Sequence, residues 1–160
     1  MPTRTPSQAS TPAAQLRAFI AKFDPSDQRL IRAVRAAARR RFPTAHELVY
    51  DNYNFLVTGY SPTPRPSDAI VSITARAGSV ALCLLQGAKL PDPKRLLRGA
   101  GHQTRSIALP TAVALADPDV EALIAAAIAR ARVPLPRTGR GKLVIRSISA
   151  KQRPRRRTVP

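Results

Sequence analysis

The sequence predicts an α+β fold in which two N-terminal helices and one C-terminal helix pack on an antiparallel sheet. Three observations support this class. Apolar residues recur at helical spacing in 13–42 and again in 118–131. Between these stretches, short runs rich in β-branched and aromatic residues are separated by turn-forming residues. A threonine or aspartate followed by proline precedes each helical stretch, as expected for an N-cap with proline in the first turn.

The composition is that of a folded, strongly basic protein. Of 160 residues, 27 are Lys or Arg and 9 are Asp or Glu, so the formal net charge is +18. The hydrophobic share of 44% separates the chain from disordered proteins. There is no apolar run of about 18 residues, which predicts no membrane span, and residues 1–11 lack the apolar core of a signal peptide. We therefore expect a cytoplasmic protein.

The helices are predicted from their caps and stripes. Thr11-Pro12 begins the first helix, and Asp24-Pro25 begins a longer one that Pro43 ends near Phe42. Arginines line the solvent side of this second helix: Arg29, Arg32, Arg35, Arg39 and Arg40. Asp92-Pro93 predicts one short helical turn over 94–98, and Asp117-Pro118 begins the final helix, which runs to about residue 131. Strands are predicted over 48–50, 53–60, 69–75 and 80–85, with 105–109 as an edge strand.

The two ends of the chain are predicted to lie outside the domain of residues 13–131. Residues 1–12, rich in Thr, Ser and Pro, are expected to be a disordered tail. Residues 132–160 carry ten Lys or Arg and no acid, and their prolines and glycines break regular structure. They are expected to be a mostly disordered basic arm, with 142–148 as a short strand or docking segment.

Several segments of the domain resemble one known family. They are Val49–Tyr53, Ser67–Ile70 and, most specifically, Gln86–Pro93 with its continuation through Leu96–Gly101 to Arg105–Ile107. Together with the Arg137–Gly141 and Lys151–Arg156 stretches, they resemble the bacterial YdhG-like domain family. The resemblance implies an α+β fold and no established enzyme activity. One branch of the family is described as a frataxin-like intracellular iron chaperone.

An iron-chaperone role is one alternative that the resemblance implies. Iron prefers carboxylate and imidazole ligands, and frataxin-type proteins present an acidic helix and an acidic strand edge. This chain departs from that pattern, because its second helix is lined with arginines and its net charge repels cations. We therefore assign no metal site and no cofactor.

The main functional prediction is a non-catalytic binding module for an anionic small molecule. The residues assigned to ligand binding are Arg98, Gly99, Gly101, His102 and Arg105, with Tyr53 as a further pocket residue. Backbone N–H groups in a glycine-containing turn, flanked by two arginines, suit a phosphate or carboxylate. The alternative is a helix C-cap at Gly99 followed by a second turn glycine.

Enzyme activity is not expected. The cluster with the most site-like chemistry is His46, Glu47, Asp51 and Tyr53, and its spacing matches no firm catalytic motif. In a strand, His46 and Glu47 point to opposite faces, so a helix-to-strand junction followed by a turn at Asp51 explains the cluster better. Cys83 lies in an apolar run and is expected to be an inert buried thiol.

The first alternative to a binding module, ahead of the iron chaperone, is a nucleic-acid-associated protein that acts through its basic arm. The residues assigned to this role are Lys151, Arg153, Arg155, Arg156 and Arg157. Positive charges on a flexible arm bind polyanions by counterion release and read charge rather than sequence. The competing interpretation is a solvated tail that contacts the domain. The sequence specifies no oligomeric state.

Overall fold

The computed structural model describes residues 10–157, which form a six-stranded sheet with helices. The helices are α1 (Pro12–Ala21), α2 (Pro25–Arg41) and α3 (Pro118–Ala129). The strands are β1 (His46–Asp51), β2 (Leu56–Ser61), β3 (Val71–Arg76), β4 (Ser79–Leu84), β5 (Arg105–Ala108) and β6 (Leu143–Ile148). The fold class is thus α+β, as predicted.

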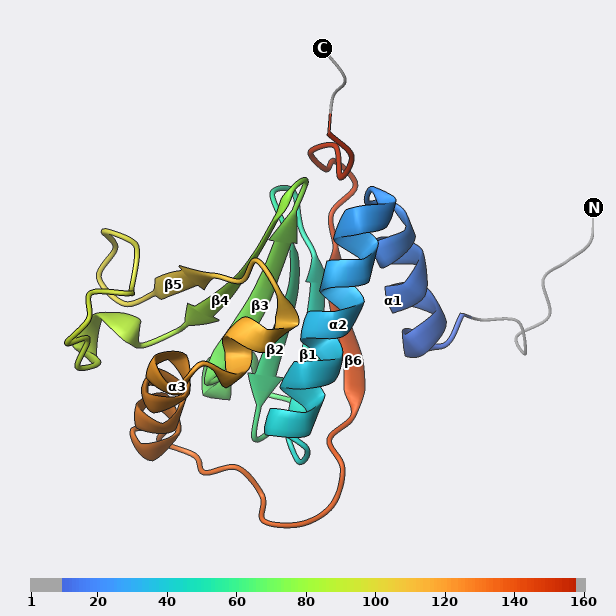
Figure 1. Cartoon of the computed structure of the whole chain (residues 1–160). Helices are drawn as coiled ribbons and strands as arrows, with labels where there is room; N and C mark the ends of the chain where they lie inside the picture. Colours follow the sequence, from blue (N-terminus) through green and yellow to red (C-terminus); the bar gives the residue numbers. More distant parts are fainter. Residues whose placement is uncertain (1–9, 158–160) are drawn as a thin grey trace, which may run out of the picture.

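The sheet is mixed, which corrects the prediction of a purely antiparallel sheet. Its strand order is β5-β4-β3-β2-β1-β6, and β1 pairs antiparallel with β2 but parallel with β6. The chain leaves α3, passes below the sheet and enters β6 at the end where β1 also begins (Figure 1). Because β1 and β6 both start from the same end of the sheet, they run in the same direction.

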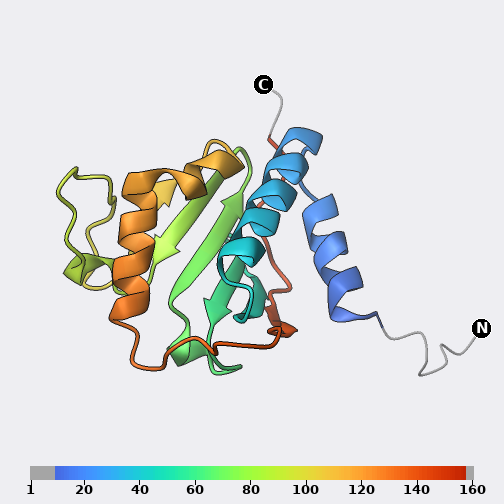
Figure 2. The same cartoon turned by 60° about the horizontal axis from the view of Figure 1, so that its bottom comes forward.

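One face of the sheet carries the core. Val49, Thr58, Ile73, Leu82 and Ile107 lie in register across five strands, and all are buried. Helices α2 and α3 lie over this face, whereas α1 lies beside α2 and contacts β6 (Figures 1 and 2). The apolar stripes of the helices and this face of the sheet form one hydrophobic cluster, the arrangement that buries most apolar area.

Helices α1, α2 and α3 all begin at predicted cap-then-proline positions, although Asp24 makes no side-chain hydrogen bond to the start of α2. The Thr11 hydroxyl accepts a hydrogen bond from the Ala14 N–H at 3.1 Å, and the Asp117 carboxylate accepts from the Asp119 N–H at 2.9 Å. Asp92 is different, because its carboxylate accepts from the backbone N–H groups of two residues in a turn, Leu96 and Leu97. The short helix predicted over 94–98 is therefore wrong. The Asp92 side chain accepts the hydrogen bonds of these amides, which in a helical turn would go to backbone carbonyls.

The C-terminal segment is integrated into the fold as far as residue 157. Leu143–Ile148 forms the edge strand β6, and Arg155 beyond it is only 4% exposed. This departs from the prediction of a mostly disordered arm over 132–160. The predicted strand at 142–148 agrees with β6. Of the predicted N-terminal tail, residues 1–9 lie outside the described residues, and Pro12 already belongs to α1.

Candidate functional site

A buried ion-pair cluster around Asp51 holds the C-terminal segment against the domain. Asp51 is the last residue of β1 and its side chain is fully buried. Its carboxylate accepts hydrogen bonds from Arg155 at 2.9 Å and from Lys22 at 2.7 Å. Burial by itself would raise the pKa of Asp51, but the hydrogen bonds from Lys22, Arg155 and Gln152 lower it below its ordinary value. Asp51 is therefore a carboxylate at neutral pH and neutralises the buried arginine.

Two acids near the start of α2 hold the segment at a second point. The backbone N–H of Arg157 donates to the Asp24 carboxylate at 3.0 Å, and the Arg157 guanidinium donates to Asp27 at 3.4 Å. Asp27 is buried and also accepts from the Gly78 N–H in the β3–β4 turn at 2.8 Å. Gly78 has φ +79, and a Cβ there would meet the Arg157 guanidinium. Glycine thus permits both the turn and the packing of Arg157 across it.

The segment and the neighbouring hairpin tips enclose a strongly basic cleft of about 850 Å³. We call it the C-terminal cleft. Its charged lining residues are Arg76, Arg153, Arg156 and Arg157. Asn54 and Ser79 add polar groups from the turns on either side. Within residues 10–157, no hydrogen bond occupies the guanidinium groups of Arg76, Arg153 and Arg156. The cleft is therefore lined by charged donors of the kind that phosphate groups accept.

Tyr53 is the neighbour in sequence of Asn54, which lines this cleft, and it contacts the lining residue Arg153. It is 49% exposed in the β1–β2 turn, and the Arg153 guanidinium stands over its ring, 5.6 Å from the centroid. The Arg153 N–H also donates to the Tyr53 carbonyl at 2.8 Å, which fixes the segment to the turn. Tyr53, predicted as a further ligand-binding residue, is thus brought together with Arg153 of the C-terminal segment.

The predicted anion loop forms an exposed excursion between the turn after β4 and β5 (Figure 1). Arg98, Gly99, Gly101 and His102 are all exposed, and Gly99 has φ +129. The Arg105 guanidinium donates to the carbonyls of Gly101 and Thr104. It therefore closes the loop on itself. Residues 98–105 do not line the C-terminal cleft.

The five residues assigned to nucleic-acid binding separate into two groups. Lys151, Arg153, Arg156 and Arg157 are exposed. Arg155 is buried, and its Nε and Nη1 atoms have no hydrogen-bond partner. Its guanidinium lies 5.9 Å from the centroid of the Phe23 ring. This cation–π contact partly offsets the free-energy cost of burying the charge. Arg155 is thus an anchor within the protein and cannot reach a ligand, which corrects its assignment.

The cluster of His46, Glu47, Asp51 and Tyr53 does not converge. Glu47 and Asp51 lie on the helix-covered face of β1, at opposite ends of the strand and about 13 Å apart along it. His46 begins the strand, and its Nδ1 accepts from the Lys142 N–H at 3.0 Å. Asp51 ends the strand rather than forming a turn. Its burial was missed because a lone aspartate before Asn52 is typical of turns.

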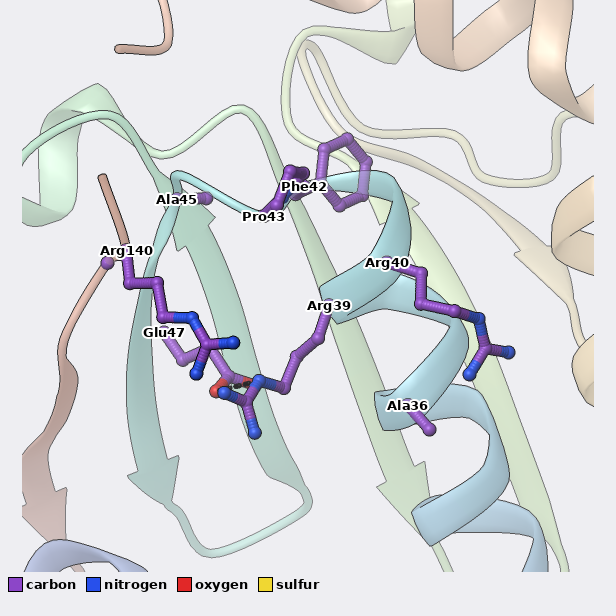
Figure 3. A pocket seen from close by; sticks show the side chains of 9 residues that line it. Ala36, Arg39, Arg40, Phe42, Pro43, Ala45, Glu47 and Arg140 are labelled. Atoms are coloured by element: carbon purple, nitrogen blue, oxygen red, sulfur yellow. Dashed lines mark ion pairs between the residues drawn. The ribbon is translucent and has the colours of Figure 1, made fainter. Parts of the chain in front are cut away.

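Glu47 is the centre of a second charged group, which the sequence did not identify. The Arg35 guanidinium donates to both Glu47 oxygens, at 3.0 and 2.9 Å, and the Tyr60 hydroxyl donates at 3.1 Å. Burial, followed by the charge of Glu47, raises the pKa of Tyr60 well above its ordinary value of 10.0. Tyr60 is therefore a neutral donor. A pocket lies beside this group at the end of α2, with Arg39 and Arg140 next to Glu47 (Figure 3).

Metal binding receives no support from this geometry. Within residues 10–157, no three His, Cys, Asp or Glu side chains gather where they would hold an ion. Glu47 and Asp51 are each engaged by basic partners, and Cys83 is only partly buried, with its sulfur 3.7 Å from the Thr74 hydroxyl. The residues therefore do not fit an iron site. No helix among the described residues is long and apolar enough to cross a membrane.

Comparisons with protein-family models, with curated proteins and with solved structures find no match to this chain. Its candidate sites are therefore interpreted from their own residues, and the resemblance to the YdhG-like family stays a prediction.

Proposed function

We propose that this protein is a non-catalytic module that binds nucleic acid by its phosphate backbone in the C-terminal cleft. The observation that carries the proposal is the convergence of four arginines, Arg76, Arg153, Arg156 and Arg157, on one concave surface. Phosphate contacts from arginine supply most of the affinity of proteins that bind nucleic acid without sequence preference. The proposal moves anion binding from the glycine loop to this cleft, because the loop uses Arg105 to bond its own carbonyls.

The buried anchor supports this proposal. Arg155 fixes the segment at Asp51 between two exposed neighbours, so Arg153 and Arg156 are held near Arg76 before any ligand arrives. A flexible arm would lose conformational entropy on binding, whereas a fixed arm loses less. Tyr53 adds an aromatic surface against the cleft residue Arg153, where an unpaired base would stack.

The absence of catalysis is part of the proposal. The two buried carboxylates of β1 are ion-paired, Glu47 with Arg35 and Asp51 with Arg155. The oxygens of both carboxylates are occupied by hydrogen bonds from basic side chains, so neither is free to act as a catalytic base. These contacts give both acids structural roles.

The test is a fluorescence anisotropy titration of a labelled 20-base-pair DNA duplex and the matching single strand at several salt concentrations. With about three phosphates neutralised by Arg76, Arg153 and Arg156, log affinity for the duplex should fall with log salt at a slope of roughly −3. Arg153→Ala with Arg156→Ala should weaken binding at least tenfold and reduce the magnitude of the slope by about 2. Tighter binding of the single strand would indicate stacking on Tyr53.

The matched control is Arg17→Ala with Arg137→Ala, which removes the same charge from two exposed positions outside the cleft. It should change the affinity less than threefold. An equal loss in both double variants would mean that net charge, rather than the cleft, causes binding. No retention of either nucleic acid at low salt would refute the proposed function.

A further inference from the structure

The pocket at the end of α2 is a second basic site, distinct from the C-terminal cleft. We call it the α2-end pocket. It encloses about 410 Å³ and lies by the start of β1, whereas the cleft lies by its end. Figure 3 shows the side chains of Arg39 and Arg140 pointing toward one another beside Glu47, while Arg40 points away along the helix. Two guanidinium groups thus face one small space.

The backbone holds Arg140 at this position. Its neighbour Gly141 packs so closely on β1 that a Cβ would overlap the carbonyl oxygen of Ala45. The next residue is fixed twice, because the Lys142 N–H donates to His46 Nδ1 at 3.0 Å and its carbonyl accepts from the Glu47 N–H at 2.9 Å. Arg140 therefore projects from a fixed backbone, although its side chain is exposed.

The charges of the pocket do not cancel. Glu47 already receives two hydrogen bonds from Arg35 and one from Tyr60, so its negative charge is satisfied from the protein side. Arg39 forms an ion pair with Glu47, drawn in Figure 3, in which Nε lies 3.7 Å from Oε1 and so beyond hydrogen-bond distance. Within residues 10–157, no hydrogen bond uses the guanidinium of Arg39 or Arg140. Arg39 and Arg140 thus line one pocket with hydrogen-bond donors unoccupied, and a dianion between them would accept from both.

The remaining walls of the pocket are apolar. They consist of Ala36, Phe42, Pro43 and Ala45. A pocket of this volume with a few convergent polar groups is within the range of small-molecule sites. An anion with an apolar body would thus place its charge between the arginines and its body against Phe42 and Pro43.

We propose that the α2-end pocket binds the phosphate group of a small molecule, with Arg39 and Arg140 as the two ligand-binding residues. The Glu47 carboxylate repels the anion and sets its position, because only the side of the arginines that faces away from Glu47 accepts it. Inorganic phosphate and organic phosphate monoesters share the recognised group. The site is independent of the proposed nucleic-acid cleft.

The test is a titration of the ¹⁵N-labelled full chain with inorganic phosphate and, separately, with phenyl phosphate, followed by amide chemical shifts. We expect saturable shifts at Ala45, Glu47 and Gly141 for both probes. Tighter binding of phenyl phosphate than of inorganic phosphate would assign the site to an organic monoester. Equal binding would assign it to the phosphate group alone, and both results support the proposal.

Four variants identify the residues responsible. Arg39→Ala and Arg140→Ala should each weaken binding at least tenfold, and the exposure of both side chains keeps the fold intact. Arg137→Ala, which removes the same charge three residues before Arg140 and outside the pocket, should change the affinity less than twofold. Arg153→Ala with Arg156→Ala should leave it unchanged, which separates this site from the cleft. The proposal is overturned if neither probe shifts the pocket amides at millimolar concentration, or if Arg137→Ala weakens binding as much as Arg140→Ala.

Discussion

The guanidinium of Arg155 donates to the carboxylate of Asp51 at 2.9 Å, although 104 positions separate the two residues. Their side chains are 3% and 0% exposed. A pair of this kind is costly to bury, so its net contribution to stability is small, but removing one partner leaves an uncompensated charge inside the protein. The pair therefore determines where the C-terminal segment lies.

Asp51→Asn should lower the free energy of unfolding by about 3–5 kcal/mol, because Arg155 would then be buried without a counter-charge. Chemical denaturation followed by circular dichroism measures this change. Asp119→Asn is the matched control, since Asp119 forms an exposed pair with Lys94 at 3.1 Å and should cost less than about 1 kcal/mol. Equal losses in the two variants would contradict a buried anchor.

The stabilisation from Asp51 should disappear in acid. The pKa of its carboxyl is below the ordinary value of 3.8 in the folded protein, so the unfolded chain binds the proton first as the pH falls. The difference in unfolding free energy between the wild type and Asp51→Asn should be constant above about pH 5 and shrink below about pH 4. Denaturation at a series of pH values measures it, and a difference that persists unchanged at pH 2 would be inconsistent with this assignment.

Gly141→Ala should destabilise the attachment of β6 to β1. The added methyl would overlap the Ala45 carbonyl oxygen, and relief requires a shift of the strand, at about 1–3 kcal/mol. Gly101→Ala is the control, because no atom lies within 4 Å of a Cβ there, and its effect should stay within about 0.5 kcal/mol. Thermal unfolding of both variants compares them; similar melting temperatures would argue against the close packing of Gly141.

Backbone amides beyond β6 should be protected from hydrogen exchange. The N–H of Ser149 donates to the Asp51 carbonyl at 2.9 Å, and that of Arg153 donates to the Tyr53 carbonyl at 2.8 Å. Exchange followed by NMR should be at least tenfold slower at these two amides than at Gly139, which lies exposed in the connection before β6. Uniformly fast exchange over 143–157 would instead agree with a disordered arm.

The sequence predicted the local elements well because their signals are local. The Thr11 cap, the proline that ends α2 and the apolar stripe of α3 each depend on residues within a few positions. The antiparallel pairing of β3 with β4 also followed from the two-residue turn between them, since strands joined by so few residues pair antiparallel. The turn at Asp92 was mistaken for a helix because an aspartate satisfies free amides in both structures.

The candidate sites depended on contacts that no local pattern encodes. Nothing near Asp51 in the sequence indicates that Lys22 and Arg155 are its partners. In the same way, no residue near Tyr53 in the sequence predicts its contact with Arg153. With 27 basic residues and 9 acids, charge alone permits many pairings of similar energy. The geometry of the packed sheet selects one of them.

By itself, the sequence determined the α+β class, most helix and strand positions and the excess of positive charge, because hydrophobic periodicity reports which side of each element is buried. Only the tertiary structure decided that β6 adds to the sheet in parallel, that Arg155 is an internal anchor and that arginines far apart in the sequence line two separate concave sites. These features arise from contacts between residues about a hundred positions apart, whose free energy depends on burial and on the exact partner rather than on residue type.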